Sequence, residues 1–216
     1  MLLWLRYQRD APGEPISVAA GEGHAADMQP LPPRSGMPGA WLTVGLRPVR
    51  AGLNIVTAVA DCEITVTNAG DAPAEAIRAA LVLISAHGGQ SGDIDAANAE
   101  PIVRPVVSPF ALAPGEERTF RSVAASQIDA LPTMRAGGRE MLVPLVVLNL
   151  QHRDTAGLEH RTSQAFVLGV ERVDSPKLAP FWLDSLRMID QVAARPSGAA
   201  LRRRVTTAAA GVGYIS

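Results

Sequence analysis

The chain is poor in cysteine, in aromatic residues and in uncompensated charge. Its one cysteine, Cys62, cannot form an internal disulfide, so cysteine usage does not identify an oxidising compartment. Aromatic residues make up 4% of the 216 positions, which argues against an aromatic platform for single-stranded nucleic acid. The 20 basic and 21 acidic residues give a formal net charge of -1, which gives no reason to expect nucleic acid or an acidic membrane surface as a partner.

A long hydrophobic run is also missing from the start of the chain. The apolar residues of Met1–Leu5 are far fewer than the ~20 needed to span a bilayer, and they lack the h-region of a signal peptide. Trp4 and Tyr7, with Arg6 and Arg9, nevertheless resemble the trailing, interfacial end of a membrane helix. Two interpretations stay open: a short apolar start, or the remnant of a longer membrane tether.

Composition divides the chain into three parts. Residues 10–40 are rich in proline and glycine without any period, so residues 1–40 are expected to be an apolar start followed by a linker. His24 and Met28 lie there four apart, and a metal site would need more ligands than these two. We predict a globular part at 41–174 and a partly disordered C-terminal extension at 175–216.

The stretch from Ala58 to Ala86 carries the strongest structural pattern. Its first half puts apolar residues on one phase of a strand, namely Ala60, Cys62, Ile64 and Val66. The intervening residues are Asp61, Glu63, Thr65 and Thr67, so one face of the strand should be buried and the other exposed to solvent. Turn-forming residues at 68–73 separate this strand from a second apolar run at 77–84. The pattern predicts two strands joined by a turn.

Further short strands follow the same logic. The candidates are 41–48 (ended by Pro48, with a turn at 50–52), 54–68 (bent or split near Ala60), 75–87, 101–112 (an edge strand or irregular crossover), 117–123, 140–152 and 160–173. Seven short strands without a long helix predict an all-β fold, an immunoglobulin-like antiparallel β-sandwich. Residues 140–152 are apolar on both phases and so predict a central strand covered on both faces, with Pro144 marking a bulge or the start of pairing.

The remaining segments predict loops and short helices. Residues 88–100 form a Gly-rich connection: Asp93, Asp95, Asn98 and Glu100 do not have the EF-hand spacing, and no Lys-Ser/Thr follows the glycines as a phosphate loop requires. Residues 125–131 allow one helical turn capped by Ser126 and ended by Pro132. Residues 180–192 admit either a short helix or an extended segment, and Arg202–Arg204 indicate a solvated tail rather than a nucleic-acid site.

Few residues suggest chemistry. Cys62 lies on the apolar phase of its strand, which favours a buried side chain over a reactive thiol. The histidines, His24, His87, His152 and His160, are dispersed along the chain, but His152 and His160 could approach each other across the last hairpin. Asp154 or Glu159 could join them in a metal or acid–base site. We assign no catalytic, cofactor-binding or metal residue from the sequence.

Two turn motifs carry a family resemblance. Residues 63–74, EITVTNAGDAPA, followed by apolar 77–84, look like the V-x-V-x-N-x-G turn of bacterial immunoglobulin-like CARDB modules. Leu112-Ala113-Pro114-Gly115-Glu116 resembles the L-x-P-G-E turn before a later strand of the same modules. The resemblance covers about 60 residues directly and implies a non-enzymatic cell-surface or adhesion domain.

Three functions remain as hypotheses. The first is a structural or protein-interaction module of the bacterial cell envelope, membrane-associated through its N-terminus, with a cytoplasmic location as the alternative. The second is a ligand- or metal-binding protein, or an enzyme, that uses His152 and His160. The third is a subunit of a larger assembly. The expected partner is a protein or a second copy of the chain, and no nucleic acid, small-molecule substrate or cofactor is evident.

Overall fold

The structure, a computed structural model, describes residues 39–205. The apolar start, nearly all of the expected linker, and His24 and Met28 lie outside these residues. The first sheet has the order β12-β1-β2-β5, and every pair in it is antiparallel. Its strands are β1 (Leu42–Leu53), β2 (Thr57–Asn68), β5 (Glu117–Gln127) and β12 (Met188–Ile189).

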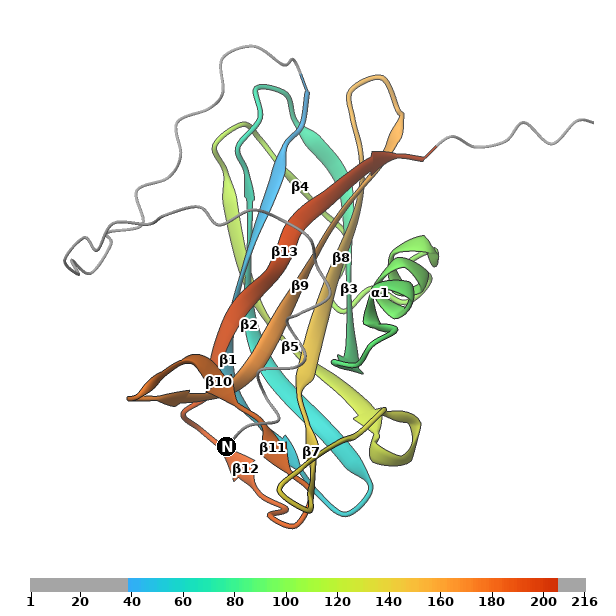
Figure 1. The fold of residues 1–216 in the computed structure, drawn as a ribbon. Coiled ribbons are helices and arrows are strands. Elements are labelled where there is room, and N and C mark those ends of the chain that lie inside the picture. Colours follow the sequence, from blue (N-terminus) through green and yellow to red (C-terminus); the bar gives the residue numbers. More distant parts are fainter. Residues whose placement is uncertain (1–38, 206–216) are drawn as a thin grey trace, which may run out of the picture. The chain divides into compact units, whose positions relative to one another are not determined.

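A second, larger sheet has the order β10-β9-β8-β3-β4, with β13 also paired to β9 (Figure 1). Its strands are β3 (Ala74–Ser85), β4 (Phe110–Leu112), β8 (Pro144–Arg153), β9 (Glu159–Arg172), β10 (Ser175–Ala179) and β13 (Ala193–Arg204). A small third sheet joins β6 (Met134–Ala136), β7 (Arg139–Leu142) and β11 (Phe181–Trp182). The helices are α1 (Gln90–Ala99) and the 3₁₀ turn η2 (Ile128–Ala130). Neither helix among residues 39–205 has the length and apolar character to cross a membrane.

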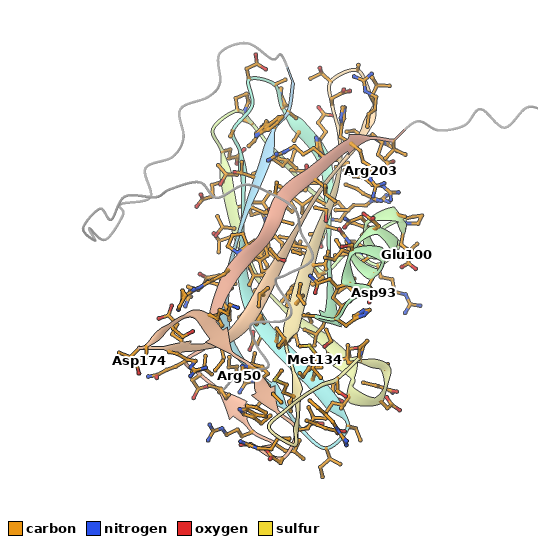
Figure 2. The ribbon with its side chains drawn as sticks, in the orientation of Figure 1. Arg50, Asp93, Glu100, Met134, Asp174 and Arg203 are labelled. Atoms are coloured by element: carbon orange, nitrogen blue, oxygen red, sulfur yellow. The ribbon has the colours of Figure 1, made fainter. Side chains whose placement is uncertain are left out.

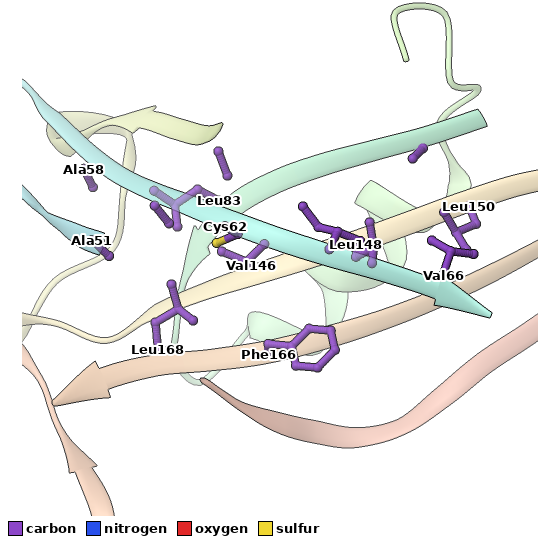
Figure 3. Close-up of a cluster of buried hydrophobic side chains, with 14 of the residues drawn as sticks. Ala51, Ala58, Cys62, Val66, Leu83, Val146, Leu148, Leu150, Phe166 and Leu168 are labelled. Carbon is purple, nitrogen blue, oxygen red and sulfur yellow. The ribbon is translucent and has the colours of Figure 1, made fainter. Parts of the chain in front are cut away.

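The predicted all-β antiparallel sandwich is confirmed. The orders β1-β2-β5 and β9-β8-β3 match the A-B-E and G-F-C orders of an immunoglobulin sandwich, and β4 adds an edge strand beside β3. The alternation of apolar and polar residues in β2 decides which face is buried. Cys62, Ile64 and Val66 are fully buried, while Glu63 and Thr65 are partly exposed. Figure 3 shows Cys62 and Val66 beside the apolar residues of β8 and β9, among them Val146, Leu148, Leu150, Phe166 and Leu168, and Ile64 belongs to the same core cluster.

The strand that we expected at the centre, β8, lies between β3 and β9 and is buried over nine of its ten residues. Val146, Leu148 and Leu150 face the main core, whereas Leu145 and Val147 face α1 on the other side of the sheet. Pro144 is its first residue, so the proline marks where pairing with β3 starts.

The predictions for β1 and the turn after it were wrong. Pro48 does not end the strand: β1 runs on to Leu53, with a register shift between Pro48 and Arg50. β12 pairs only with Ala51 and Gly52, so β1 is an edge strand at Pro48, and proline is tolerated at edges and bulges. The turn comes at 54–56 instead, where the Asn54 side chain accepts hydrogen bonds from the N–H groups of Val56 and Thr57. β2 continues through Ala60 without a register shift against β5.

Several other segments also differ from expectation. Residues 90–99 form α1 where we expected a flexible loop. β5 extends to Gln127, so Ser126 lies in a strand and does not cap η2. Residues 180–192 hold β11 and β12 rather than a helix, which leaves the extended alternative. Arg202–Arg204 are exposed, as expected, but they belong to β13 and pair with β9 instead of forming a tail.

Candidate functional site

The β8–β9 hairpin brings His152 and His160 together, as the sequence suggested. They are direct cross-strand partners, and their rings stack with centroids 5.3 Å apart and an interplanar angle of 18°. His160 Nε2 lies 2.8 Å from Asp154 Oδ2, so Asp154 joins the pair. Glu159 is opposite Arg153 one step further along the hairpin. The hairpin turn therefore holds an aspartate–histidine pair beside a second, buried histidine.

Burial keeps His152 neutral. Its side chain is 3% exposed, and burial lowers its pKa from 6.5 to about 4, with the nearby His160 adding to the shift and Asp154 opposing it. Neither ring nitrogen has a hydrogen-bond partner among the described residues. The hydrogen bond from His160 is the main cause of a lowered pKa of Asp154, with help from the backbone N–H groups of Leu158 and Ala156.

The pair lacks the surroundings of a nucleophilic site. Within residues 39–205, His160 hydrogen-bonds to Asp154, and no serine, threonine or cysteine side chain bonds to either imidazole ring. Across the same residues there is no group of three or more His, Cys, Asp or Glu side chains placed to hold a metal ion.

A pocket of about 70 Å³ opens beside His152. We call it the hairpin pocket; its walls are Ala76, Arg78, Gln151, His152, Arg153 and Glu159. The sequence did not reveal it, because Ala76 and Arg78 come from β3 and reach the hairpin only through the pairing of β3 with β8.

A second, smaller cavity of about 10 Å³ lies where the C-terminal end of α1 meets the sheet. Arg161 Nη1 donates hydrogen bonds to the carbonyls of Asn98, Ala99 and Glu100, which closes the helix end. Asn98 also bonds to the Ser163 hydroxyl. Arg203 of β13 and Glu100 line this cavity, and Figure 2 shows both near that end of α1. Its volume suits about one water molecule.

The oxygen-bearing residues weighed for calcium do not converge. Asp93 and Asp95 are two apart on α1, and helical residues at that spacing do not face each other. Asp93 instead pairs with His87, with Nε2 and Oδ2 2.6 Å apart. Cys62 is fully buried, and burial raises its pKa to about 12, with Asp61 adding to the rise. This thiol is a packed core side chain.

The β1–β2 turn and β12 lie at the same end of the sandwich (Figure 1). Exposed aliphatic residues lie in that turn, in β12 and just before β12. We call this group of residues the apolar end. Its members are Ile55 (85% exposed), Val56 (65%), Leu186 (46%) and Met188 (42%). The Leu53 N–H donates to the Arg187 carbonyl at 3.1 Å, and Met188 pairs with Gly52. A Cβ at Gly52 would collide with the backbone of Arg187 and Met188, so glycine lets the two segments approach.

No family model, curated protein or solved structure matches the chain. The CARDB resemblance therefore stays a prediction from the two turn motifs, and function has to be argued from the site geometry.

Proposed function

We propose that the chain is a non-enzymatic protein-interaction module of the bacterial cell envelope, built on an immunoglobulin-like sandwich of the CARDB kind. The observation that supports it is the apolar end, where Ile55 and Val56 occupy a hairpin turn that polar residues usually fill. Clustered exposed aliphatic side chains on a folded domain are typical of surfaces that bind another protein.

The turn that presents these residues is well ordered by its own hydrogen bonds. Asn54 Oδ1 accepts from Val56 N at 2.9 Å and from Thr57 N at 2.7 Å, and the Val56 carbonyl accepts from Ile128 N at 2.9 Å. A surface held in one conformation before binding loses less conformational entropy when a partner docks. The turn is therefore suited to recognition.

Charged and aromatic groups flank the apolar end, as at the rim of a typical interface. Arg139 forms a bidentate ion pair with Asp184, with both oxygens at 2.6 Å, and its guanidinium lies 4.3 Å from the centre of the Trp182 ring. Arginine and tryptophan are enriched at protein interfaces, and such pairs often surround an apolar centre. This composition favours a protein partner.

Site-specific photo-crosslinking in native cells tests the proposal. A photoreactive amino acid at Ile55 or at Leu186 should give a discrete protein adduct, because both positions lie in the apolar end. The adduct from the Leu186 probe should disappear when Val56→Asp is added, since a buried charge at the centre would oppose docking. A self-adduct of two chains would identify the partner as a second copy.

The matched control places the same probe at Val103, which is 83% exposed and lies outside the apolar end. Equal adducts from Val103 and Ile55, or no adduct from Ile55 and Leu186, would contradict the proposal. Cell fractionation of the chain expressed from its native gene tests the envelope location. The envelope location is supported by the interfacial pattern of Trp4, Tyr7 and Arg9. A product found only in the cytosol would contradict this location.

A further inference from the structure

The hairpin pocket lies where the pairing of β3 with β8 is interrupted. Glu75 pairs with Arg153 and Arg78 with Gln151, so Ala76 and Ile77 stand opposite the single residue His152. Ala76 has φ 49°, a left-handed backbone conformation that is strained for a residue with a Cβ. Such strain gathers at ligand-binding positions, and here it shapes the wall of a pocket of about 70 Å³.

One hydrogen-bonding group of the pocket walls lacks a partner. The side-chain nitrogen of Gln151 is buried without a hydrogen bond to any residue in 39–205. Gln151 is 7% exposed, and its oxygen is already used by the Ile102 N–H at 3.2 Å. Buried polar groups without partners are rare in folded proteins and call for an explanation, of which a ligand is one.

The two arginines of the pocket are also unpaired within the described part of the chain. No salt bridge among residues 39–205 includes Arg78 or Arg153. Other arginines of the same domain, such as Arg121 and Arg139, make bidentate pairs with aspartates. The guanidinium groups at the hairpin pocket are thus available to an external acceptor.

The net charge of the pocket walls suits a ligand that carries one negative charge. Arg78 and Arg153 contribute two positive charges, Glu159 contributes one negative charge, and His152 is neutral near pH 7. The walls therefore carry a net charge of about +1. A carboxylate has one charge and two oxygens that fit a guanidinium fork, whereas a phosphate dianion would add a second charge beside Glu159.

We propose that the hairpin pocket binds a carboxylate, with Arg78 and Arg153 supplying the charge and the Gln151 side-chain nitrogen supplying a neutral donor. The carboxylate comes either from a small free carboxylic acid or from the C-terminus of a peptide. About 70 Å³ holds a carboxylate with one or two further carbons. This site is separate from the apolar end, so the test of one proposal does not decide the other.

Nuclear magnetic resonance titration of the full chain at pH 7 and constant ionic strength tests the site. The probes are acetate, acetyl-triglycine as the free acid, acetyl-triglycine amide and inorganic phosphate. We expect saturable shifts of the Ala76, Gln151 and His152 amides with the two carboxylates and none with the amide. Acetyl-triglycine binding at least tenfold tighter than acetate would identify the peptide as the source, and similar affinities would identify a free acid.

Variants separate a built site from general charge attraction. Arg78→Gln and Arg153→Gln should each weaken carboxylate binding by about tenfold or more, because each removes a charge-assisted hydrogen bond. Both side chains are exposed, so the folded spectrum should persist. The matched control is Arg172→Gln, which removes an exposed arginine at the other end of β9 and should leave binding unchanged. Absence of saturable shifts, equal binding of phosphate, or equal weakening by Arg172→Gln would overturn the proposal.

Discussion

Asn68 shows at the residue scale what the turn motifs encode. It is fully buried, and its side-chain nitrogen donates to the carbonyls of Ala72 and Leu112 at 2.8 and 3.1 Å. Its side-chain oxygen accepts from the N–H groups of Trp41 and Gly70 at 3.1 Å. The asparagine of the first motif thus fixes both its own turn and the strand before the second motif. The sequence showed both turns but could not show that one residue joins them.

Asn68→Ala should lower the free energy of unfolding by about 3 kcal/mol, because four hydrogen bonds are lost and buried carbonyls are left without donors. The matched control is Asn54→Ala, whose two bonds lie in an exposed turn and which should cost about 1 kcal/mol or less. Urea unfolding measures both, with an unchanged slope confirming that only stability changed. Equal losses for the two variants would contradict the role given to Asn68.

His152 should make stability depend on pH between about 4 and 6.5. The folded protein holds this residue neutral with a pKa of about 4, whereas the unfolded chain takes up the proton near pH 6.5. The unfolded state then binds more protons in this window, so stability falls as pH falls, by about 3 kcal/mol from pH 7 to pH 4. Asp61 and Asp154 have lowered pKa values and act only at lower pH.

Urea unfolding at several pH values measures this effect in the wild type and in His152→Leu. The variant should lose most of the slope between pH 6.5 and 4, because leucine fills the site without titrating. His87→Leu is the matched control, since His87 is a partly exposed histidine on the connection before α1. A wild-type slope that survives in His152→Leu would show that another group is responsible.

At the scale of the element, α1 was the main failure of sequence reasoning. Its residues, Gln90–Ala99, have little amphipathic pattern, and glycines precede and interrupt them. Tertiary contacts supply what the local sequence lacks: Ile94 and Ala97 pack on Leu145 and Val147, and the Asn149 side chain donates to the Ala97 carbonyl at 2.8 Å. A helix held by its neighbours cannot be predicted from its own residues.

The closure of α1 by Arg161 gives a prediction at this scale. Arg161→Gln removes the donor to three carbonyls at the helix end, so the helix should open locally more often. We expect about tenfold faster amide hydrogen exchange in residues 90–99, with β2 unchanged, measured by mass spectrometry. Arg172→Gln on the same strand is the control. Unchanged exchange in α1 would mean that packing alone holds it.

At the scale of the whole described domain, the alternation of apolar and polar residues predicted the sandwich. A strand that is buried on one face and exposed on the other must alternate in this way. β2 carries that alternation, and β8 carries the doubly apolar pattern of a covered strand. The contact between β13 and the start of β1 was not predictable, since it joins residues about 160 positions apart in the chain: Arg202 of β13 lies 3.9 Å from the Trp41 ring centre and donates to the Leu42 carbonyl at 3.1 Å. The hairpin pocket escaped prediction for the same reason, because β3 completes it.

Cys62 offers a readout of the whole sandwich. It is fully buried between the two sheets (Figure 3), and its pKa is raised to about 12, so a thiol reagent can react only when the sheets separate. Labelling of the native protein at pH 8 should therefore be slow and should follow the global free energy of unfolding.

Leu148→Ala, which removes a fully buried core side chain, should destabilise the protein by about 2–5 kcal/mol and speed labelling accordingly. A cysteine introduced by Val173→Cys at a fully exposed position should react at once and serves as the control. If Cys62 reacted as fast as that cysteine in the folded wild type, the two-layer packing around β2 would be wrong.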